Sequence, residues 1–242
     1  MNTIRGPGAS AATLIHGASG RMGQSLLRLA GDRNDLEVVG AVSRGVDQRV
    51  VDGVPRFRAS ELAGVPVFDV AIDFSRSEAF DGILALCAGR GAALVSGTTA
   101  LTTAQVAAME AASARIPILW ASNFSLGVAV LASLVERAAE ALPGWDCDIV
   151  ESHHARKVDA PSGTALMLGT VASRHDAQPR YASLRAGDIV GEHTVQFATE
   201  GERIELIHRA TNRDIFARGA LTAAAWLPRR DPGMYTLADL FA

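Results

Sequence analysis

The sequence predicts an α/β protein in two parts: a Rossmann-like, doubly wound parallel sheet, and an α+β domain with a mixed or antiparallel sheet. Two observations carry this prediction. Apolar runs alternate with helical patterns between residues 13 and 120, as they do in repeated βαβ units. Beyond residue 142 the rhythm changes, and two alternating runs flank the turn Glu200-Gly201-Glu202, a pattern typical of an antiparallel hairpin.

A glycine turn follows the first predicted strand, over 13–16, and leads into a helical pattern and a second strand over 36–42. This order is the context in which a glycine fingerprint indicates dinucleotide binding. Gly17 would permit the tight turn, Gly20 the approach of a pyrophosphate, and Gly23 close helix packing. The spacing differs from G-x-G-x-x-G because Ser19 fills the middle position. The predicted cofactor-binding residues of this turn are Gly17, Ala18, Ser19, Gly20, Arg21 and Met22.

Further strands are predicted over 67–74, 92–96 and 116–120, with helices after residue 75 and over 102–115. In a parallel sheet, ligands bind at the carboxyl ends of the strands. We therefore expect the residues that follow each strand to surround one crevice with the glycine turn, although any one of these loops could be turn chemistry alone. They are Ser43, Arg44, Phe74, Gly97, Thr98, Thr99, Asn123 and Phe124.

The end of the second strand bears on which dinucleotide is bound. NAD binders usually carry Asp or Glu there, about twenty residues after the glycines, to accept from the ribose. This chain has Ser43 and Arg44. A carboxylate would repel a 2′-phosphate, whereas arginine attracts one. We expect NADPH to be preferred, or both cofactors to be used; the alternative is that Arg44 is only a solvated loop residue.

The second part is expected to begin with a helix over 127–142 and a strand over 147–151. A helix over 166–174, a polar connection containing Pro179, and strands over 189–199 and 203–208 follow. A final alanine-rich helix over 215–227 could pack back on the first part. The predicted domains are therefore 1–125 for the dinucleotide, 126–214 for substrate and oligomerisation, and 215–242 as the returning helix, with hinges near Ser125 and 212–215.

The stretch 151–165 concentrates the chemistry of the second part. His153 and His154 can supply a proton near neutral pH, and Lys157 can balance negative charge. Pro161 and the Ser162-Gly163-Thr164 turn precede apolar residues, so they read as a helix start, capped by Ser162 or Thr164. A helix start suits a carboxylate or phosphate.

Each of these features also has a plainer interpretation. Paired histidines are often surface residues, and a Ser-Gly-Thr turn is often only a cap. Adjacent histidines on an extended chain point to opposite faces, and no third ligand stands at a zinc-like spacing. We therefore expect an anion-binding and proton-donating site, and no metal.

Composition excludes several classes of protein. A net charge of −3, with 48% hydrophobic residues, gives no reason to expect a nucleic acid or a membrane as partner. Cys87 and Cys147 lie in apolar contexts and are expected to be buried thiols. Residues 1–12 read as a short disordered tail and not as a signal peptide. No apolar run approaches the roughly 20 residues of a membrane span, so a cytoplasmic protein is expected.

The motif E-x-H-H-x-x-K-x-D-x-P-S-G-T-A over 151–165 resembles the dihydrodipicolinate reductase family of bacterial lysine and diaminopimelate biosynthesis. The resemblance extends to the G-x-x-G-R-M-G turn over 17–23, to 73–74, 97–99, 123–128 and 186–193, and to the tail around 216–217. It implies reduction of a cyclic imine to tetrahydrodipicolinate by NADPH or NADH, in an enzyme that is usually a homotetramer built through the second domain's sheet.

The resemblance also implies roles. His153 would be the general acid and Lys157 the second catalytic group, while His154 and the Gly163-Thr164 backbone would hold a substrate carboxylate. Ser162, in the same turn, is also predicted to be a substrate-binding residue. The cofactor would be lined by 17–22, Arg44, 97–99 and, following the strand at 116–120, Ala121, Ser122, Asn123 and Phe124.

The chain departs from the family pattern at three places. The acid that many relatives carry after the second strand is Ser43, the glycine that often follows Gly-Thr-Thr is Ala100, and the 174–184 connection is short. The last departure bears on substrate affinity and assembly.

Two other functions stay open at this point. The first is another two-domain nicotinamide enzyme, such as a sugar dehydrogenase or an aspartate dehydrogenase; the sugar enzymes, however, carry a Glu-Lys-Pro step where this chain has 97–99. The second is a regulator that binds NADPH without turnover, which would leave the combination of His153, Lys157 and the Ser-Gly-Thr turn unexplained.

Overall fold

A computed structural model describes residues 10–241, which divide into two compact units. One comprises the chain up to Phe124 together with the segment from Phe216 onward, and the other is Ser125–Ile215. We call them the 10–124 unit and the 125–215 unit. The first strand already begins at Ala11, so the predicted tail is too long at its end, and residues 1–9 lie outside the described residues.

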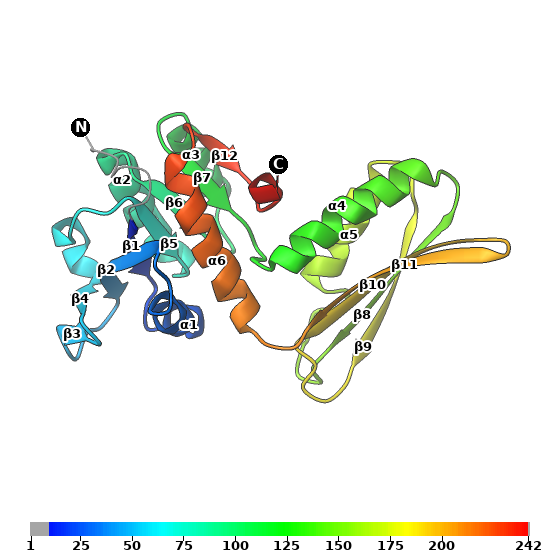
Figure 1. The fold of residues 1–242 in the computed structure, drawn as a ribbon, viewed down its shortest axis with the longest axis horizontal. Coiled ribbons are helices and arrows are strands. Elements are labelled where there is room, and N and C mark those ends of the chain that lie inside the picture. Colours follow the sequence, from blue (N-terminus) through cyan, green and yellow to red (C-terminus); the bar gives the residue numbers. More distant parts are fainter. Residues whose placement is uncertain (1–9, 242) are drawn as a thin grey trace. The chain divides into compact units, whose positions relative to one another are not determined.

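The 10–124 unit is built on an eight-stranded sheet with the order β12-β7-β6-β5-β1-β2-β4-β3 (Figure 1). All neighbouring pairs are parallel except β3 with β4. The sheet grows in opposite directions from β1, as in the Rossmann order, which places a ligand crevice at the carboxyl ends beside β1. Its strands are β1 (Ala11–His16), β2 (Leu36–Ser43), β3 (Val50–Val51), β4 (Val54–Arg58), β5 (Val70–Asp73), β6 (Ala93–Ser96), β7 (Pro117–Trp120) and β12 (Gly233–Tyr235).

Helices cover this sheet and bury its apolar strands. The middle strands are almost wholly buried, and side chains such as Phe68, Phe80 and Leu94 form the core with the helices that follow. Continuous apolar strands of this kind are typical of a parallel sheet enclosed by helices. The helices are α1 (Arg21–Ala30), α2 (Ser77–Arg90), α3 (Thr103–Ser113) and α6 (Asp214–Trp226), with short 3₁₀ turns η1 (Ala59–Gly64), η2 (Leu227–Arg229) and η3 (Ala238–Phe241).

The 125–215 unit is a four-stranded sheet with the order β11-β10-β8-β9 and two helices, α4 and α5 (Figure 1). Alternate residues of β8 and β10 are buried, so one face of the sheet carries the core, which includes Ile149, Leu168 and Phe197. The elements are α4 (Leu126–Ala141), β8 (Asp146–His153), α5 (Gly163–Ser173), β9 (Pro179–Arg185), β10 (Gly191–Thr199) and β11 (Glu202–Ala210).

The fold class is confirmed: a mostly parallel α/β sheet and a second α+β unit whose sheet is mixed. The mixture arises from β9, which pairs parallel with β8, while β10 pairs antiparallel with β8 and β11. The prediction of a plain connection over 174–184 is wrong, because 179–185 forms this edge strand. Five of its seven residues are exposed, so no apolar alternation marks it in the sequence.

Three further strands, β3, β4 and β12, also escape the sequence pattern, since they are short and lie toward the edges of the sheet. Both cysteines are buried and free, as expected. Among the described residues no helix is long and apolar enough to cross a membrane.

Candidate active site

Strand β8 brings the first part of the 151–165 motif to the buried face of its sheet. Glu151 and His153 alternate with the outward residue Ser152, so both side chains enter the interior, where they are 0% and 8% exposed. The chain then leaves the sheet through a loop carrying His154 and Lys157, and returns at α5. Ser162 caps that helix by accepting a hydrogen bond from Ala165 N at 3.2 Å, which settles the choice between the two predicted caps.

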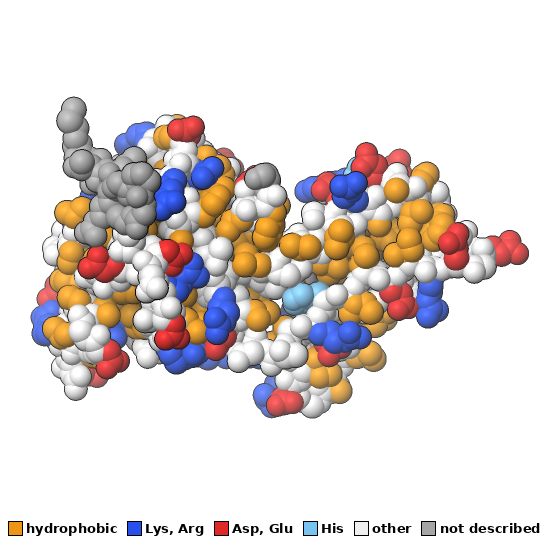
Figure 2. Space-filling model, in the orientation of Figure 1, with side chains coloured by type: hydrophobic (Ala, Val, Ile, Leu, Met, Phe, Trp, Pro, Cys, Tyr) orange, Lys and Arg blue, Asp and Glu red, His pale blue; other side chains and the backbone are white. Residues whose placement is uncertain are grey.

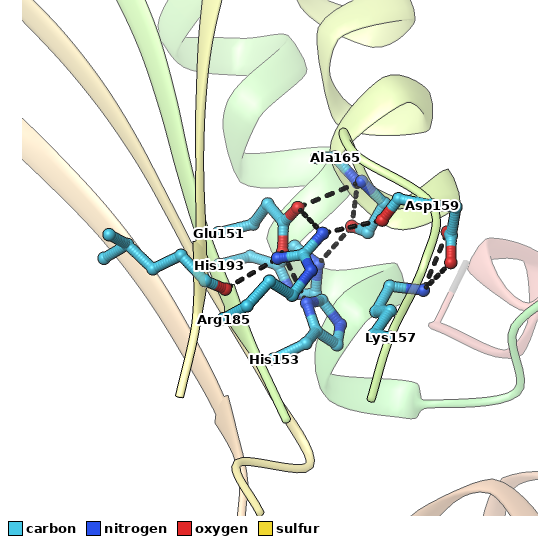
Figure 3. Close-up of polar contacts among 9 residues, drawn as sticks. Glu151, His153, Lys157, Asp159, Ala165, Arg185 and His193 are labelled. Carbon is cyan, nitrogen blue, oxygen red and sulfur yellow. Dashed lines mark hydrogen bonds and ion pairs between the residues drawn. The ribbon is translucent and has the colours of Figure 1, made fainter. Parts of the chain in front are cut away.

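The carboxylate of Glu151 is the centre of a buried hydrogen-bond network (Figure 3). Its Oε2 lies 2.5 Å from His153 Nδ1, and the two oxygens accept from Arg185 Nη1 at 2.8 Å and Nη2 at 2.7 Å. Oε1 also accepts from Ser162 N at 3.2 Å. Burial raises the pKa of this carboxyl, but hydrogen bonds from Arg185, Ser183 and His153 outweigh it and bring the pKa to about 2.

An ionised carboxylate can only accept hydrogen bonds, so His153 Nδ1 carries a hydrogen and donates it to Glu151. The other ring nitrogen, Nε2, is then the position that can exchange a proton with a ligand. Gly191 on β10 leaves room beside it: a Cβ atom added there would lie 3.0 Å from His153 Nε2. The hydrogen bond to Glu151 on the same strand therefore determines that Nε2 is the nitrogen through which the predicted general acid, His153, can act.

A third histidine, which sequence analysis did not single out, packs against His153. The ring of His193 meets that of His153 edge-on, with centroids 5.2 Å apart, and its Nε2 lies 3.0 Å from Ser162 Oγ. Burial, reinforced by the charge of His153, lowers the pKa of His193 to about 4. His193 is therefore neutral near pH 7.

The loop between β8 and α5 carries the remaining predicted groups. Lys157 Nζ donates to both carboxylate oxygens of Asp159, at 2.8 and 2.7 Å, and Lys157 lies beside the His153 network in Figure 3. Burial and the charges of Arg156 and Arg213 lower the pKa of His154. A Cβ added at Gly163 would meet no atom within 4 Å, so the first turn of α5 is open where Gly163 and Thr164 begin the helix.

In the 10–124 unit, the glycine turn adopts a conformation that only glycine accommodates. Gly17 has a φ of 82°, and a Cβ there would lie 2.4 Å from the carbonyl oxygen of Phe74. A Cβ at Gly23 would lie 2.4 Å from Gly17 O, so α1 packs against the turn itself. Gly20 begins α1 without a side-chain cap. The helix start is thus shaped for an anion held by backbone N–H groups.

Two adjoining cavities follow this turn along the carboxyl ends of the strands. The first, of about 590 Å³, is lined by Gly17, Ser19, Gly20, Ser43, Arg44 and Phe74 among others. The second, of about 420 Å³, is lined by Gly20, Arg21, Met22, Phe74, Gly97 and Thr99 among others. The structure therefore brings most of the predicted cofactor residues together.

Two arginines near these cavities were missed by sequence analysis. Arg76 lines both of them and lies three residues after the carboxyl end of β5, and this position is the signal that could have found it. Arg56 on β4 lines a further cavity of about 320 Å³ that shares Ser19 and Ser43 with the first and includes Ala18. Its strand was not predicted, so nothing in the sequence placed it there.

Two of the remaining predicted residues, Thr98 and Phe124, contact residues at or just after the carboxyl end of β5, whereas Ala121, Ser122 and Asn123 line neither of the two cavities. Thr98 is buried, and its hydroxyl donates to Asp73 at 2.8 Å, beside Ser96 and His16, which contact the same carboxylate at 2.9 and 2.8 Å. Burial raises the pKa of Asp73, but hydrogen bonds from His16, Ser75 and Thr98, together with the charge of His16, outweigh it and lower the pKa. Phe124 packs edge-on against Phe74 at 5.3 Å. It ends the segment Ala121, Ser122, Asn123 and Phe124, which follows β7.

Comparisons with known proteins agree with this geometry. Residues 12–124 match the family "Dihydrodipicolinate reductase, N-terminus" and residues 127–241 match "Dihydrodipicolinate reductase, C-terminus". The 4-hydroxy-tetrahydrodipicolinate reductase of Stenotrophomonas maltophilia (strain K279a) is 69% identical over 229 residues, which cover 94% of this chain and 96% of that protein. The enzyme of the same name from Xanthomonas axonopodis pv. citri (strain 306) is 68% identical over 228 residues, again covering 94% and 96%.

A solved structure extends the likeness to the fold. Dipicolinate-bound dihydrodipicolinate reductase from Paenisporosarcina sp. TG-14 matches with a TM-score of 0.82 at 22% identity, over 94% of this chain and 97% of that one. The resemblance first drawn from residues 151–165 is therefore confirmed across both units. This chain belongs to the dihydrodipicolinate reductase family.

Proposed function

We propose that His153 is the general acid and Lys157 the second catalytic group of this chain's reaction. The chain is an NAD(P)H-dependent oxidoreductase that reduces 4-hydroxy-tetrahydrodipicolinate in lysine and diaminopimelate biosynthesis. This sets aside a sugar or aspartate dehydrogenase and a non-catalytic regulator. We further propose that 1–125 together with 215–242 holds the cofactor, and that 126–214 holds the substrate.

The observation that carries the role of His153 is its hydrogen bond to a buried, ionised Glu151. With Nδ1 committed to that bond, Nε2 is left to deliver the proton to the ring carbon beside the one that is reduced. Lys157, whose ammonium lies on the loop that follows, would offset the negative charge that develops during protonation or relay a proton. General acids of this kind contribute roughly 10²–10⁴-fold to turnover.

The substrate is a dicarboxylate, so it needs anion sites near the acid. The first turn of α5 supports one of them, because helix starts concentrate N–H groups and positive potential. Gly163 and Thr164 would supply backbone N–H groups there, and His154, whose Nδ1 is buried without a hydrogen-bond partner, would hold the same carboxylate. Ser162 would serve by fixing the turn, since its hydroxyl and its N–H are engaged with Ala165, His193 and Glu151.

The residues of the 10–124 unit fit a nicotinamide dinucleotide. The turn 17–23 has no room for side chains at Gly17 and Gly23, and its uncapped helix start suits a pyrophosphate. The bound cofactor supplies the hydride; this unit binds and orients it. The cradle would consist of Gly17, Ala18, Ser19, Gly20, Arg21, Met22, Ser43, Arg44, Phe74, Gly97, Thr98, Thr99, Ala121, Ser122, Asn123 and Phe124.

Preference for NADPH over NADH is part of the proposal. Ser43 puts no carboxylate at the end of β2, and Arg44 and Arg76 line the same cavity. Guanidinium groups bind phosphates through charge-assisted hydrogen bonds. Arg56, whose Nε is buried without a hydrogen-bond partner, lines the adjoining cavity on the Ser43 side and would add to this attraction.

Assembly as a homotetramer is also proposed, through the sheet of the 125–215 unit. Leu184 on β9 and Ile207 on β11 are exposed, at 55% and 42%, and both strands are edges of the sheet. An exposed edge strand offers unpaired backbone groups to which another chain can pair. Figure 2 also shows hydrophobic side chains gathered beside α4 on this unit, where Val130 and Leu134 are exposed. Light scattering on the purified chain would test it. A cytoplasmic location remains a prediction.

The direct test of the reaction is the loss of nicotinamide absorbance when dihydrodipicolinate synthase generates the substrate in the cuvette. Rapid oxidation of NADPH and slower oxidation of NADH are expected. In the variant Arg44→Ala, NADPH should bind more weakly while NADH is unaffected. Equal effects on the two cofactors would contradict the 2′-phosphate assignment, and the absence of turnover with either would contradict the proposed chemistry.

A further inference from the structure

Arg185, the last residue of β9, joins the two chain segments that carry the catalytic groups. Its Nη1 and Nη2 donate to the two oxygens of Glu151, and Nη2 also donates to the carbonyl oxygen of Asp159 at 2.7 Å. Nη1 further donates to Leu184 O at 2.6 Å. Figure 3 shows this guanidinium between Glu151 and the 154–162 loop. Through one planar group, the strand behind His153 is tied to the loop that bears Lys157.

We propose that Arg185 is a positioning residue for both catalytic groups. Through Glu151 it fixes the tautomer and the ring orientation of His153, and through Asp159 it holds the loop on which Lys157 stands. The inference rests on the proposed roles of His153 and Lys157, and it adds a residue that does not itself contact the substrate.

The first half of this inference follows from the state of Glu151. A carboxylate that is 0% exposed is costly to ionise unless cations and donors compensate it. Arg185 is the only residue that donates to both of its oxygens in the described contacts. Without it, Glu151 would gain a proton or turn toward water. A protonated Glu151 could donate to His153 Nδ1, which would move the ring hydrogen to Nε2 and reverse the pattern that aims the acid.

The second half follows from the loop. Asp159 Oδ1 and Oδ2 hold the ammonium of Lys157, and Asp159 O accepts from Arg185. The backbone of Asp159 is therefore fixed from one side while its side chain fixes Lys157 from the other. Because Asp159 is 60% exposed at its side chain, the carbonyl contact is the tie that leads into the buried network. Loss of the tie would release the loop without removing any catalytic group.

A lysine could not replace this arginine. Nη1 and Nη2 of the rigid guanidinium each donate two hydrogen bonds, and the four bonds reach three residues. A lysine ammonium offers only a single nitrogen. Arg185→Lys keeps the positive charge that offsets Glu151 and removes the fork. It is therefore the informative substitution.

The same two strands provide a matched control. Arg180 on β9 donates to both oxygens of Asp148 on β8, at 2.6 and 3.1 Å. This pair is more exposed and lies on the opposite face of the sheet from Glu151. Arg180→Lys breaks an equivalent fork between the same strands at a place that no catalytic group contacts.

The experiment compares wild type, Arg185→Lys, Arg180→Lys and His153→Gln. For each variant, kcat and KM are measured over pH, the NADPH Kd serves as a check on the other unit, and ¹⁵N NMR reads the tautomer of His153. We expect Arg185→Lys to lower kcat by roughly 10²-fold, as misplacement of catalytic groups does, to change the pH profile of kcat, and to raise the population of the Nε2–H form. Arg180→Lys should change none of these.

Failure of the inference and failure of the proposed function are separable. If His153→Gln retains wild-type turnover, the role of His153 is wrong. If His153→Gln loses turnover while Arg185→Lys keeps the wild-type kcat, pH profile and tautomer, the positioning role is wrong. An Arg185→Lys variant that is only less stable, with an unchanged pH profile and tautomer, would equally overturn it. A second variant, Glu151→Gln, should reproduce the tautomer change of Arg185→Lys.

Discussion

Acidification from neutral pH is expected to destabilise the 125–215 unit because His193 must take up a proton where charge is excluded. The imidazole is 4% exposed and lies beside His153 and Ser162. Burial lowers its pKa from 6.5 to about 4, whereas in the unfolded chain the group is protonated below about pH 6.5. On acidification the unfolded state therefore binds the proton before the folded state does. The contribution of neutral His193 to the free energy of unfolding is fully present above about pH 6.5 and is lost as the pH falls toward 4.

The size of the effect follows from the two pKa values. At about pH 4.5, unfolded His193 is almost fully protonated, while the folded group, with a pKa of about 4, is mostly neutral. The linkage relation then gives a loss of about 2.5 kcal/mol between about pH 7.5 and pH 4.5. The substitution His193→Gln removes the titrating group and can retain a hydrogen bond to Ser162, so this part of the pH dependence should vanish.

Urea unfolding, followed by the fluorescence of Trp145, would measure the free energy of unfolding at each pH. Trp145 packs against the core of the 125–215 unit, and replacing Trp120 and Trp226 with Phe leaves it as the only tryptophan. His175→Gln, just beyond α5, is the matched control and should keep the wild-type slope. If His193→Gln loses the same free energy of unfolding between these two pH values as wild type does, the burial argument for His193 is refuted.

Three further predictions use the same kind of contact. Ser162→Ala removes the cap of α5 and the hydrogen-bond partner of His193, so the free energy of unfolding should fall by about 2 kcal/mol. The control Ser173→Ala, at the exposed end of α5, should change it little, and equal effects of the two substitutions would contradict the capping role. Gly97→Ala places a Cβ 2.1 Å from the Phe74 ring, an overlap that costs about 1–3 kcal/mol, so NADPH should bind roughly tenfold more weakly. Gly89→Ala, where a Cβ meets nothing within 4 Å, is its control in a fluorescence titration, and unchanged NADPH affinity in Gly97→Ala would count against the cradle. Arg56→Met should weaken NADPH binding about tenfold and leave NADH binding unchanged. The control Arg115→Met should change the affinity for neither cofactor. If Arg56→Met weakened NADH binding as much as NADPH binding, Arg56 would not contact the 2′-phosphate.

The sequence predicted the central strands, the glycine turn and the capped helix start correctly, because each has a local pattern that is compatible with only one structure. Continuous apolar runs marked the central strands, and the glycine turn at Gly17 was identified because its backbone conformation excludes other residues. The 151–165 motif predicted a capped helix start, and Ser162 provides it. These features are local, so they can be read without knowing which segments meet.

What the sequence could not show depends on contacts between distant segments. Arg185 lies on β9, an exposed edge strand without apolar alternation, and its role appears only when β9 pairs with β8. His193 similarly meets His153 through the pairing of β10 with β8. Arg56 depends on β4, which contains a proline and is partly buried over its first four residues. Ala100 has a φ of 56°, and only the structure shows that this residue adopts the left-handed conformation.

The most direct test of the account compares wild type and His153→Gln in the coupled NADPH oxidation assay. If His153 delivers the proton, kcat should fall by roughly 10²–10⁴-fold, while the NADPH Kd, which we assign to the 10–124 unit, should be unchanged. Turnover by His153→Gln at the wild-type rate would contradict the assignment of His153 as the general acid.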